Sequence, residues 1–554
     1  MNRLWYGDNL TIMQGMEKYS VDLIYLDPPF KSDANYNLLY KTMTGKPLPE
    51  QVEAFCDTWE MDAQKEAIAR SMPVLMREHG VDDYYVDFWR LWMQALRKTQ
   101  PHLLAYLIFM VQRMLHMKSI LRPTGSIYLH CDPTASHYIK VMMDGIFGHD
   151  NFRNEIIWQR TGAHGRAKKW GPIHDTILFY SASKNYTWNL VYEKYDQSYI
   201  DDFYRFNDAH GQYRLVTLDG PGIRGGFSGT PWRGVDPGTK GRHWELPPDR
   251  ALPKWFKYPL GYAQMSVQNR LEVLDAAGLI YWPKRGFVPQ YKRYLAVSEG
   301  NPVQDIITDI RPIGSQAKER MGYPTQKPVA LLDRIIRASS NPGDVVFDPF
   351  CGCGTTIYAA QAIGRKWIGC DIAILSIKMV RETLRSDKFR LVEGHDFTVD
   401  GIPTSVDGAQ ELFNKDPSIF QNWFVERVGG FPMARKSADR GIDGRIYFET
   451  GEGLREMMIQ VKGGKHVRPT DVRDLRGVLE REENAELAGF LSITPPTKAM
   501  LSEAAEAGTY EYQGRQYPRI QFLTSKDVLE DKREFLMPTR VNTKISTGQQ
   551  SFAL

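Results

Sequence analysis

Apolar residues along the first 187 positions follow two kinds of pattern, short continuous runs and longer stretches with helical spacing. The short runs predict strands at 4–8, 21–27, 126–131 and 175–181. The longer stretches predict helices at 85–121 and 137–147, and Pro123 and Gly125 end the first of them. Strands that alternate with helices in this way are typical of a parallel α/β sheet.

Between about 188 and 310 this alternation stops. The segment is rich in Gly, Pro, Trp, Tyr and Arg, and its aromatic residues are too frequent for a disordered linker. The α/β pattern returns near 328 with a predicted helix, followed by strands at 344–348 and 367–372. We therefore expect an α/β domain in two parts, 1–187 and 311–400, with an inserted region between them.

The C-terminal part of the chain has a pattern of its own. A polar stretch at 396–408 predicts a linker, and 409–535 is expected to form a separate small α/β unit. Its predicted helices lie near 418–428 and 470–482, and its predicted strands near 444–449 and 456–462. Residues 541–554 are polar and are expected to form a frayed tail.

Composition indicates a globular protein in a reducing compartment. Apolar residues make up 42% and charged residues 25% of the 554 positions, as in soluble proteins. The longest apolar run, 103–111, is too short to span a membrane, and the N-terminus has no signal-peptide core. Five cysteines in a chain of this length argue against a disulfide framework, and C-G-C at 351–353 is too tight for a zinc pair. We expect a cytoplasmic protein without membrane contact.

Positive charge is concentrated in the middle of the chain. The formal net charge is only +4. Residues 155–330 nevertheless contain 24 Lys and Arg against 17 Asp and Glu, a surplus of +7. A basic region rich in aromatic residues is a modest indication of contact with nucleic acid.

A glycine-rich motif, F-D-P-F-C-G-C-G-T-T at 347–356, follows one predicted strand and precedes a helix. Its glycines allow a ligand to approach the free N–H groups of the helix N-terminus. Asp371 ends the next strand, 23 residues after Asp348, where an acid commonly binds ribose hydroxyls. The motif lacks G-x-G-x-x-G and a P-loop lysine. It therefore fits a nucleoside with a small zwitterionic tail better than a dinucleotide or a triphosphate.

A second motif, D-P-P-F at 27–30, ends the strand at 21–27 and holds an acid and an aromatic ring in a stiff turn. Together the two motifs resemble those of DNA amino-methyltransferases, in which acid–Pro–Pro–aromatic is catalytic and F-x-G-x-G binds S-adenosylmethionine. The catalytic motif comes first here, as in the β group of N6-adenine and N4-cytosine methyltransferases. The segments G-D-N-L (7–10), G-S-I-Y-L-H-C-D (125–132) and Y-P-T-Q-K-P (323–328) also match in order.

The resemblance covers about 1–400 and implies a circularly permuted, Rossmann-like S-adenosylmethionine-dependent methyltransferase sheet. The inserted target-recognition region would be 188–310. Asp27 and the backbone carbonyl of Pro28 would accept the hydrogens of the target amine, and Pro29 would stiffen the turn. Phe30 would stack on a base flipped out of the duplex. Asp in place of Ser at position 27 favours N6-adenine as the target, with N4-cytosine as the alternative.

The same resemblance implies a set of cofactor-binding residues: Asp8, Thr325, Lys327, Asp348, Phe350, Gly352, Gly354 and Asp371. Asp348 would contact the methionine part of the cofactor, Asp371 the ribose and Asp8 the adenine ring. Thr325 and Lys327 would lie near the cofactor carboxylate. The family commonly has His at the position of Tyr323.

The C-terminal unit resembles the PD-(D/E)xK core of Mrr-like restriction endonucleases. Asp443 in G-I-D-G opens one predicted strand, and Q-V-K at 460–462 ends the next. By this resemblance Asp443 and Gln460 would hold Mg²⁺, Lys462 would position the attacking water or the phosphate, and Glu426 would add a ligand. Gln stands where most such cores have Glu or Asp, and the Mrr-like group accepts it. The alternatives are a DNA-binding relic and an unrelated fold.

Three functions follow as hypotheses. The first is a site-specific methyltransferase of double-stranded DNA in restriction–modification or phage defence, as a homodimer or with further defence-system subunits. The second is a metal-dependent DNA endonuclease whose methyltransferase half mainly recognises and protects sites. The third is a non-catalytic DNA-binding subunit of a larger complex.

Overall fold

The protein is described by a computed structural model that covers most of the chain. The described residues are 1–29, 59–162, 170–284, 288–314, 317–321, 323, 325–433, 441–451, 453–464, 467–482 and 484–538, with the backbone of short strands at 36–38, 40–41, 52–55 and 544–545. The chain forms two compact units, Leu190–Gln304 and the remainder. Of the expected polar tail at 541–554, all but 544–545 lies outside the described residues.

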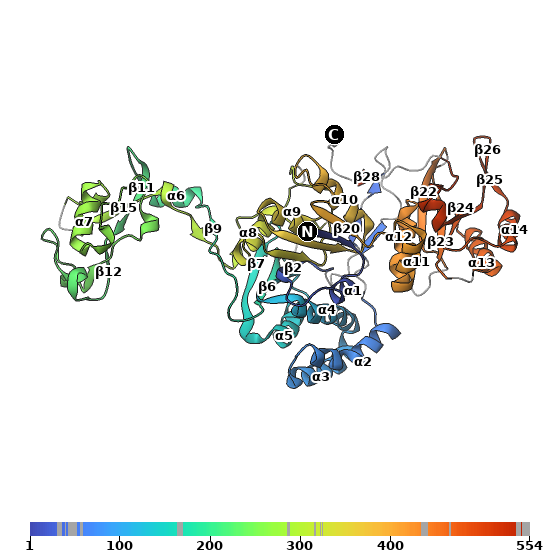
Figure 1. Ribbon diagram of the computed structural model, residues 1–554, viewed down its shortest axis with the longest axis horizontal. Helices are drawn as coiled ribbons and strands as arrows, with labels where there is room; N and C mark the ends of the chain where they lie inside the picture. Colours follow the sequence, from blue (N-terminus) through green and yellow to red (C-terminus); the bar gives the residue numbers. More distant parts are fainter. Residues whose placement is uncertain are drawn as a thin grey trace. The chain divides into compact units, whose positions relative to one another are not determined.

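A nine-stranded sheet organises the larger unit (Figure 1). In spatial order its strands are β17 (Ile306–Ile307), β7 (Phe152–Gln159), β8 (His174–Ser181), β6 (Leu121–Cys131), β2 (Val21–Leu26), β18 (Val345–Asp348), β19 (Lys366–Asp371), β1 (Asn2–Tyr6) and β20 (Phe397–Asp400). Neighbouring strands are parallel except where β8 pairs with β6 and with β7. The sheet is therefore mixed, and the expectation of a parallel sheet holds for all but this one reversed strand.

Helices cover both faces of this sheet, and each face has its own apolar core (Figure 1). One layer contains α2 (Ala63–Glu78), α3 (Asp83–Thr99), α4 (Pro101–Ile120) and α5 (Ser136–Phe147). The other contains α8 (Val329–Ser339), α9 (Thr355–Ala362) and α10 (Ile374–Arg385), while the short α1 (Asn9–Gln14) follows β1. Helix α4 is buried on nearly all sides, which explains why 103–111 is apolar without alternation. Among the described residues, no helix is long and apolar enough to cross a membrane.

Two sequence-based boundaries differ from the structure. The helix expected at 85–121 is two helices, because Pro101 starts α4 after a non-helical Gln100. The expected linker at 396–408 begins with β20, which pairs in parallel with β1 at the edge of the main sheet. An edge strand tolerates polar side chains, so the polarity of this segment wrongly suggested a linker.

The smaller unit, Leu190–Gln304, lies within the segment where the sequence pattern breaks. Its main sheet has the order β10 (Phe206–Asp208), β11 (Gly211–Thr217), β15 (Gln290–Tyr294) and β14 (Ile280–Tyr281). The further elements are α6 (Gln197–Phe203), α7 (Val267–Ala276) and the strand pairs β9 (Tyr192–Glu193) with β16 (Asn301–Pro302) and β12 (Asp219–Pro221) with β13 (Arg242–Trp244). An aromatic core that includes Trp232, Trp244 and Tyr291 holds the unit together.

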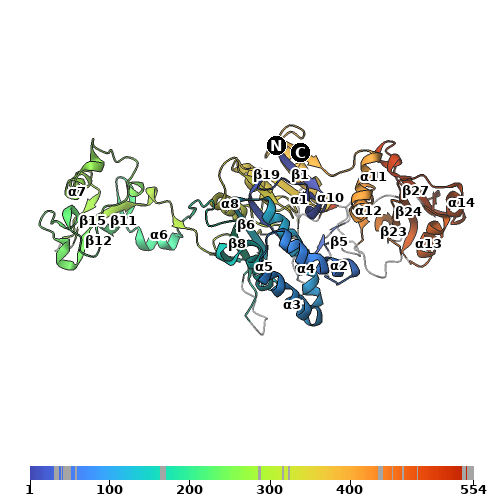
Figure 2. The same cartoon turned by 60° about the horizontal axis from the view of Figure 1, so that its bottom comes forward.

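The C-terminal segment has a second sheet, ordered β21 (Phe431–Pro432), β22 (Gly444–Thr450), β23 (Gly453–Lys462), β24 (Ala485–Ser492) and β27 (Ile520–Thr524). Its helices are α11 (Val406–Lys415), α12 (Pro417–Arg427), α13 (Pro469–Leu479), α14 (Lys498–Glu506) and α15 (Ser525–Leu529), and β25 (Thr509–Tyr512) pairs with β26 (Arg515–Pro518). Figure 2 shows α11 and α12 beside this sheet. The expected separate unit has its own sheet and a core cluster of its own, yet part of its apolar residues join a core that also contains residues of the main sheet.

Candidate functional site

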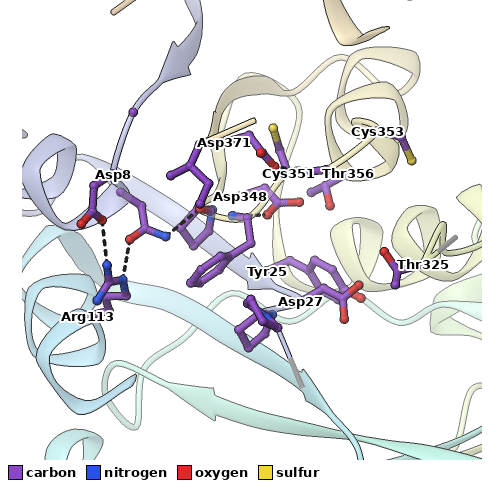
Figure 3. Close-up of a pocket in the computed structure, with 18 of the residues that line it drawn as sticks. Asp8, Tyr25, Asp27, Arg113, Thr325, Asp348, Cys351, Cys353, Thr356 and Asp371 are labelled. Atoms are coloured by element: carbon purple, nitrogen blue, oxygen red, sulfur yellow. Dashed lines mark hydrogen bonds and ion pairs between the residues drawn. The ribbon is translucent and has the colours of Figure 1, made fainter. Parts of the chain in front are cut away.

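Four acidic residues lie at the ends of four neighbouring strands. Asp27 follows β2, Asp348 ends β18, Asp371 ends β19, and Asp8 follows β1. These strands are adjacent in the sheet in this order and are parallel. Parallel strands end at the same edge of a sheet, so the four side chains gather there (Figure 3).

The pairing of β2 with β18 joins the two sequence motifs. Leu23 lies opposite Val346 and Ile24 opposite Phe347, so D-P-P-F and the glycine loop leave the sheet side by side. A cavity of about 340 Å³ opens at this edge. Its walls include the expected residues Asp8, Asp27, Pro28, Pro29, Thr325, Lys327, Asp348, Phe350, Gly352 and Asp371. Gly354 does not line the cavity itself but lies between Cys353 and Thr355, which do, and Phe30 lies outside the described residues.

The glycine loop between β18 and α9 is closely packed. Gly352 and Gly354 have φ angles of 49° and 88°, in the region that favours glycine. The Gly352 N–H donates to the Asp371 carboxylate over 2.9 Å. A Cβ on Gly354 would lie 2.7 Å from Val380 Cγ2. The backbone conformation of the loop therefore favours glycine at these two positions.

Two of the four acids are strongly affected by burial. Burial raises the pKa of Asp348 to about 7, although hydrogen bonds from Thr356 and from the Phe350 N–H favour its ionised form. Burial also raises the pKa of Asp371 to about 6, against hydrogen bonds from Ala373 and Gly352. A cationic ligand in the cavity would stabilise both carboxylates, because it would replace lost solvation with an opposite charge.

Asp27 forms an ion pair with Lys327 across 300 residues of sequence. Both side chains are largely shielded from solvent, with exposed fractions of 17% and 10%. The resemblance to the family implies a place for Lys327 near the cofactor carboxylate, and in the structure its ammonium group pairs with Asp27. This ion pair orients the carboxylate of Asp27, the first residue of the D-P-P-F turn.

Arg113 is a site residue that the sequence reasoning missed. It is buried in α4. Its guanidinium group donates one hydrogen bond to the Asp8 carboxylate over 2.8 Å and another to Asn9 Oδ1 over 2.7 Å. Asn9 in turn donates to the carbonyl of Pro349 in the glycine loop over 2.8 Å. The network connects β1, α4 and the loop (Figure 3). A lone arginine within an apolar helix could have indicated it, since a buried charge requires a partner.

A buried polar chain lies beneath the D-P-P-F turn and was also missed. Tyr25, two residues before Asp27, is hydrogen-bonded to His130 Nδ1 over 2.8 Å, and His130 Nε2 to Asp175 over 3.1 Å. Asp175 also pairs with Arg160 at 3.2 Å. Burial opposes ionisation of Asp175, but the hydrogen bond of His130 and nearby positive charges lower its pKa. His130 belongs to the segment 125–132, which is one of those that resemble the family. These hydrogen bonds fix the end of β2 that leads into the D-P-P-F turn.

Helix α12 of the C-terminal segment supplies a further wall of the cavity. Asp416, Ser418, Ile419 and Asn422 line it. Glu426, expected among the nuclease residues, accepts a hydrogen bond from the Ile374 N–H at the start of α10 over 3.2 Å. Desolvation raises the pKa of Glu426 to about 8. Its carboxylate therefore contacts the segment that follows β19 of the nine-stranded sheet, and its role as a nuclease ligand stays a prediction.

Of the other three residues expected for a nuclease, Asp443 directly precedes β22, and Gln460 and Lys462 lie on β23. The Val461 N–H donates to the carboxylate of Asp443 over 2.7 Å, beside Gln460. The Gln460 side chain is 4% exposed, and its Oε1 has no hydrogen-bond partner among the described residues. Lys462 follows on the same strand and pairs with Asp471 at 3.7 Å. No group of three His, Cys, Asp or Glu side chains in the described ranges is arranged to hold a metal ion.

Comparison with known proteins identifies the family of the chain. The DNA methylase family of N6 and N4 amino-methyltransferases matches residues 21–382, well over half of the chain. The chain therefore belongs to this family, which confirms the resemblance to DNA amino-methyltransferases. The glycine loop and seven of the nine strands of the main sheet lie within the matched residues.

Individual relatives match different lengths of the chain. The Type II methyltransferase M1.MboII of Moraxella bovis is 53% identical over 253 residues, 45% of this chain and 67% of that protein. The DNA adenine methyltransferase YhdJ of Escherichia coli K12 is 61% identical over 61 residues, 11% of this chain and 21% of that protein. The chain spans about half the length of the curated relatives that it matches over longer stretches. A crystal structure of an M1.HpyAVI–SAM complex is 15% identical and covers 69% of this chain and all of that one, with a TM-score of 0.26.

Proposed function

We propose that this protein transfers a methyl group from S-adenosylmethionine to the exocyclic amine of a base in double-stranded DNA. One observation carries the proposal. The acid of D-P-P-F and the acids at the ends of β18, β19 and β1 line one cavity at one edge of the sheet. The family of the chain and the Type II relative support a role in restriction–modification or phage defence.

The residues of the cavity suit this cofactor. S-adenosylmethionine supplies an electrophilic methyl group on a cationic sulfur when it is bound. Asp348, Asp371 and Asp8 would hold its methionine part, ribose and adenine, while Phe350, Gly352 and Gly354 would shape the pocket. Thr325 lines the cavity on the side of Lys327 and would contact the cofactor carboxylate. A cavity with several carboxylates attracts a cationic ligand and repels a triphosphate.

Asp27 and Pro28 would act on the target amine. An amine conjugated to a base ring is a weak nucleophile, and its hydrogens need acceptors before its lone pair can attack in line. The Asp27 carboxylate and the Pro28 carbonyl would accept them, and Lys327 would keep that carboxylate oriented. Pro29 limits the freedom of the turn. Phe30 would stack on the flipped base.

We propose N6-adenine as the target, with N4-cytosine as the alternative. Asp27 in place of Ser supports adenine, and so does the strong local identity with a DNA adenine methyltransferase. We further propose that the unit Leu190–Gln304 recognises the target sequence. Its large exposed apolar side chains, such as Phe227 and Leu260, occur among basic residues, as expected for stacking and phosphate contact.

Methyl transfer from labelled S-adenosylmethionine to unmethylated genomic DNA tests the proposal directly. Transfer by the full chain should be lost in Asp27→Ala while cofactor binding, measured by calorimetry, remains. Asp87→Ala, an exposed change on α3, serves as the matched control and should keep full transfer. Transfer that persists in Asp27→Ala contradicts the assigned role of Asp27. Mapping of the modified base distinguishes adenine from cytosine.

A metal-dependent endonuclease activity of the C-terminal segment is the second candidate. The buried, unpartnered Oε1 of Gln460 beside Asp443 supports it, because carboxylate and amide oxygens are ligands that Mg²⁺ accepts. These two residues would hold the ion, and Lys462 would steady the phosphate. Unmethylated plasmid should be cleaved with Mg²⁺ by the full chain and left intact by Lys462→Ala, with methyl transfer unchanged. Plasmid that stays intact with the full chain over a range of divalent ions argues against the activity.

A further inference from the structure

Helix α12 has two faces with different surroundings. Phe420, Trp423 and Phe424 are fully buried in the core that α12 shares with β22 and β23. Ile419 and Asn422 lie three residues apart on another face and line the cavity of the methylase sheet. The helix is therefore a firmly packed part of the C-terminal segment that also forms part of the candidate active site.

Two hydrogen bonds connect α12 to residues at the ends of β1 and β19 in the nine-stranded sheet. The Tyr6 hydroxyl, at the end of β1, donates to the backbone carbonyl of Ile419 over 3.4 Å. The Glu426 carboxylate accepts from the Ile374 N–H, just beyond the end of β19, over 3.2 Å. These anchors lie at the strand ends that carry Asp8 and Asp371. Helix α12 therefore borders the part of the cavity assigned above to the nucleoside.

The polar side chains of α12 and its N-cap at the cavity differ in whether they already form hydrogen bonds within the protein. The carboxylate of Asp416 already caps its own helix, since it accepts from the N–H groups of Ser418 and Ile419. The side-chain amide of Asn422 has no hydrogen-bond partner among the described residues. An amide both donates and accepts, which matches the edge of an adenine ring or a ribose hydroxyl.

We propose that α12 completes the nucleoside end of the S-adenosylmethionine site, with the Asn422 amide hydrogen-bonded to the adenosine part. This inference rests on the function proposed above. A ligand that contacts both the methylase sheet and α12 stabilises their association, and the association strengthens ligand binding by the same factor. The cofactor is thus an effector of the C-terminal segment as well as the methyl donor.

Calorimetric titration of the full chain with S-adenosylhomocysteine tests the contact. Asn422→Ala should bind about 3- to 10-fold more weakly, the effect of one lost hydrogen bond. Asn414→Ala, an exposed change on the neighbouring α11, removes the same chemical group away from the cavity and should leave binding unchanged. In Asn422→Ala, kcat at saturating S-adenosylmethionine should persist while KM rises. Equal affinity of the two variants overturns the assignment of Asn422.

Hydrogen–deuterium exchange of the wild-type chain tests the coupling without any variant. S-adenosylhomocysteine should slow exchange in 417–427 as well as in the glycine loop. Slowing confined to the loop overturns the inference and leaves the proposed function intact. If the wild type neither binds the ligand nor transfers methyl groups, the proposed function fails first. The two failures are therefore distinguishable.

Discussion

The raised pKa of Asp348 predicts that cofactor affinity falls steeply as the pH is lowered. In the free protein burial raises this pKa to about 7. A cationic ligand prefers the carboxylate, so binding lowers the pKa and releases a proton. Affinity is then highest above about pH 7 and falls about tenfold per pH unit below it.

The size of the effect follows from the two buried acids. At about pH 5.5, only about 3% of an acid with a pKa near 7 is ionised, so affinity is about 30-fold lower than at high pH. Asp371, with a pKa of about 6, adds a further loss of about fourfold on the same argument. The total is about 100-fold, or about 2.7 kcal/mol. The cofactor's amino group stays protonated below about pH 7, so it does not contribute over most of this range.

Calorimetry with S-adenosylmethionine from about pH 5.5 to about pH 7.5 measures this dependence. Asp348→Asn mimics the protonated acid. It should bind weakly at the higher pH and show only the smaller dependence that Asp371 contributes. S-adenosylhomocysteine is the matched ligand without the sulfonium charge, and its affinity should change less with pH. A wild-type affinity that stays constant over the whole range would refute the reasoning.

Three further predictions concern single residues of the site. Gly354→Ala should destabilise the fold by about 1–3 kcal/mol in urea denaturation, because the φ of 88° is strained for alanine and an added Cβ would lie 2.7 Å from a side chain of α10. Arg113→Met should cost about 2–4 kcal/mol in the same assay, since it leaves the partly buried Asp8 carboxylate without its cation; a loss below about 1 kcal/mol would contradict this. Lys327→Met should lower kcat about 10- to 100-fold with little change in cofactor affinity, because its ammonium group pairs with Asp27. The opposite pattern, weak cofactor binding with normal kcat, would assign Lys327 to the cofactor instead.

The elements around the site were largely predictable from local patterns. The strands that lead to Asp27, Asp348 and Asp371 are short, largely apolar runs, because helices cover both faces of a central strand. Each run is followed or ended by an acid, which marks the end of the strand in the sequence. The glycines of the loop stand where the backbone needs positive φ. Strand β20 was misread as linker because an edge strand tolerates polar residues.

Contacts between distant segments were not predictable in this way. Arg113 and Asp8 are 105 residues apart, and Tyr6 and Ile419 are 413 apart. Hydrophobic periodicity reports which face of an element is buried, but it contains no information on the partner that buries it. Glu426 shows the consequence: no local pattern indicated that its carboxylate accepts a hydrogen bond from the N–H of Ile374 at the start of α10.

The sequence by itself determined the kinds of groups available to this protein and their local geometry. It specified an acid in a proline-stiffened turn, a glycine loop before a helix and acids at strand ends, because these features depend on neighbours in the chain. Only the tertiary structure decided which of them meet. Strand order placed four acids around one cavity, while the packing of the loop before α8 and of α12 brought Lys327 to Asp27 and Asn422 to the same cavity. The physical reason is that sheet pairing and core packing join residues hundreds of positions apart, at sites that no local pattern marks.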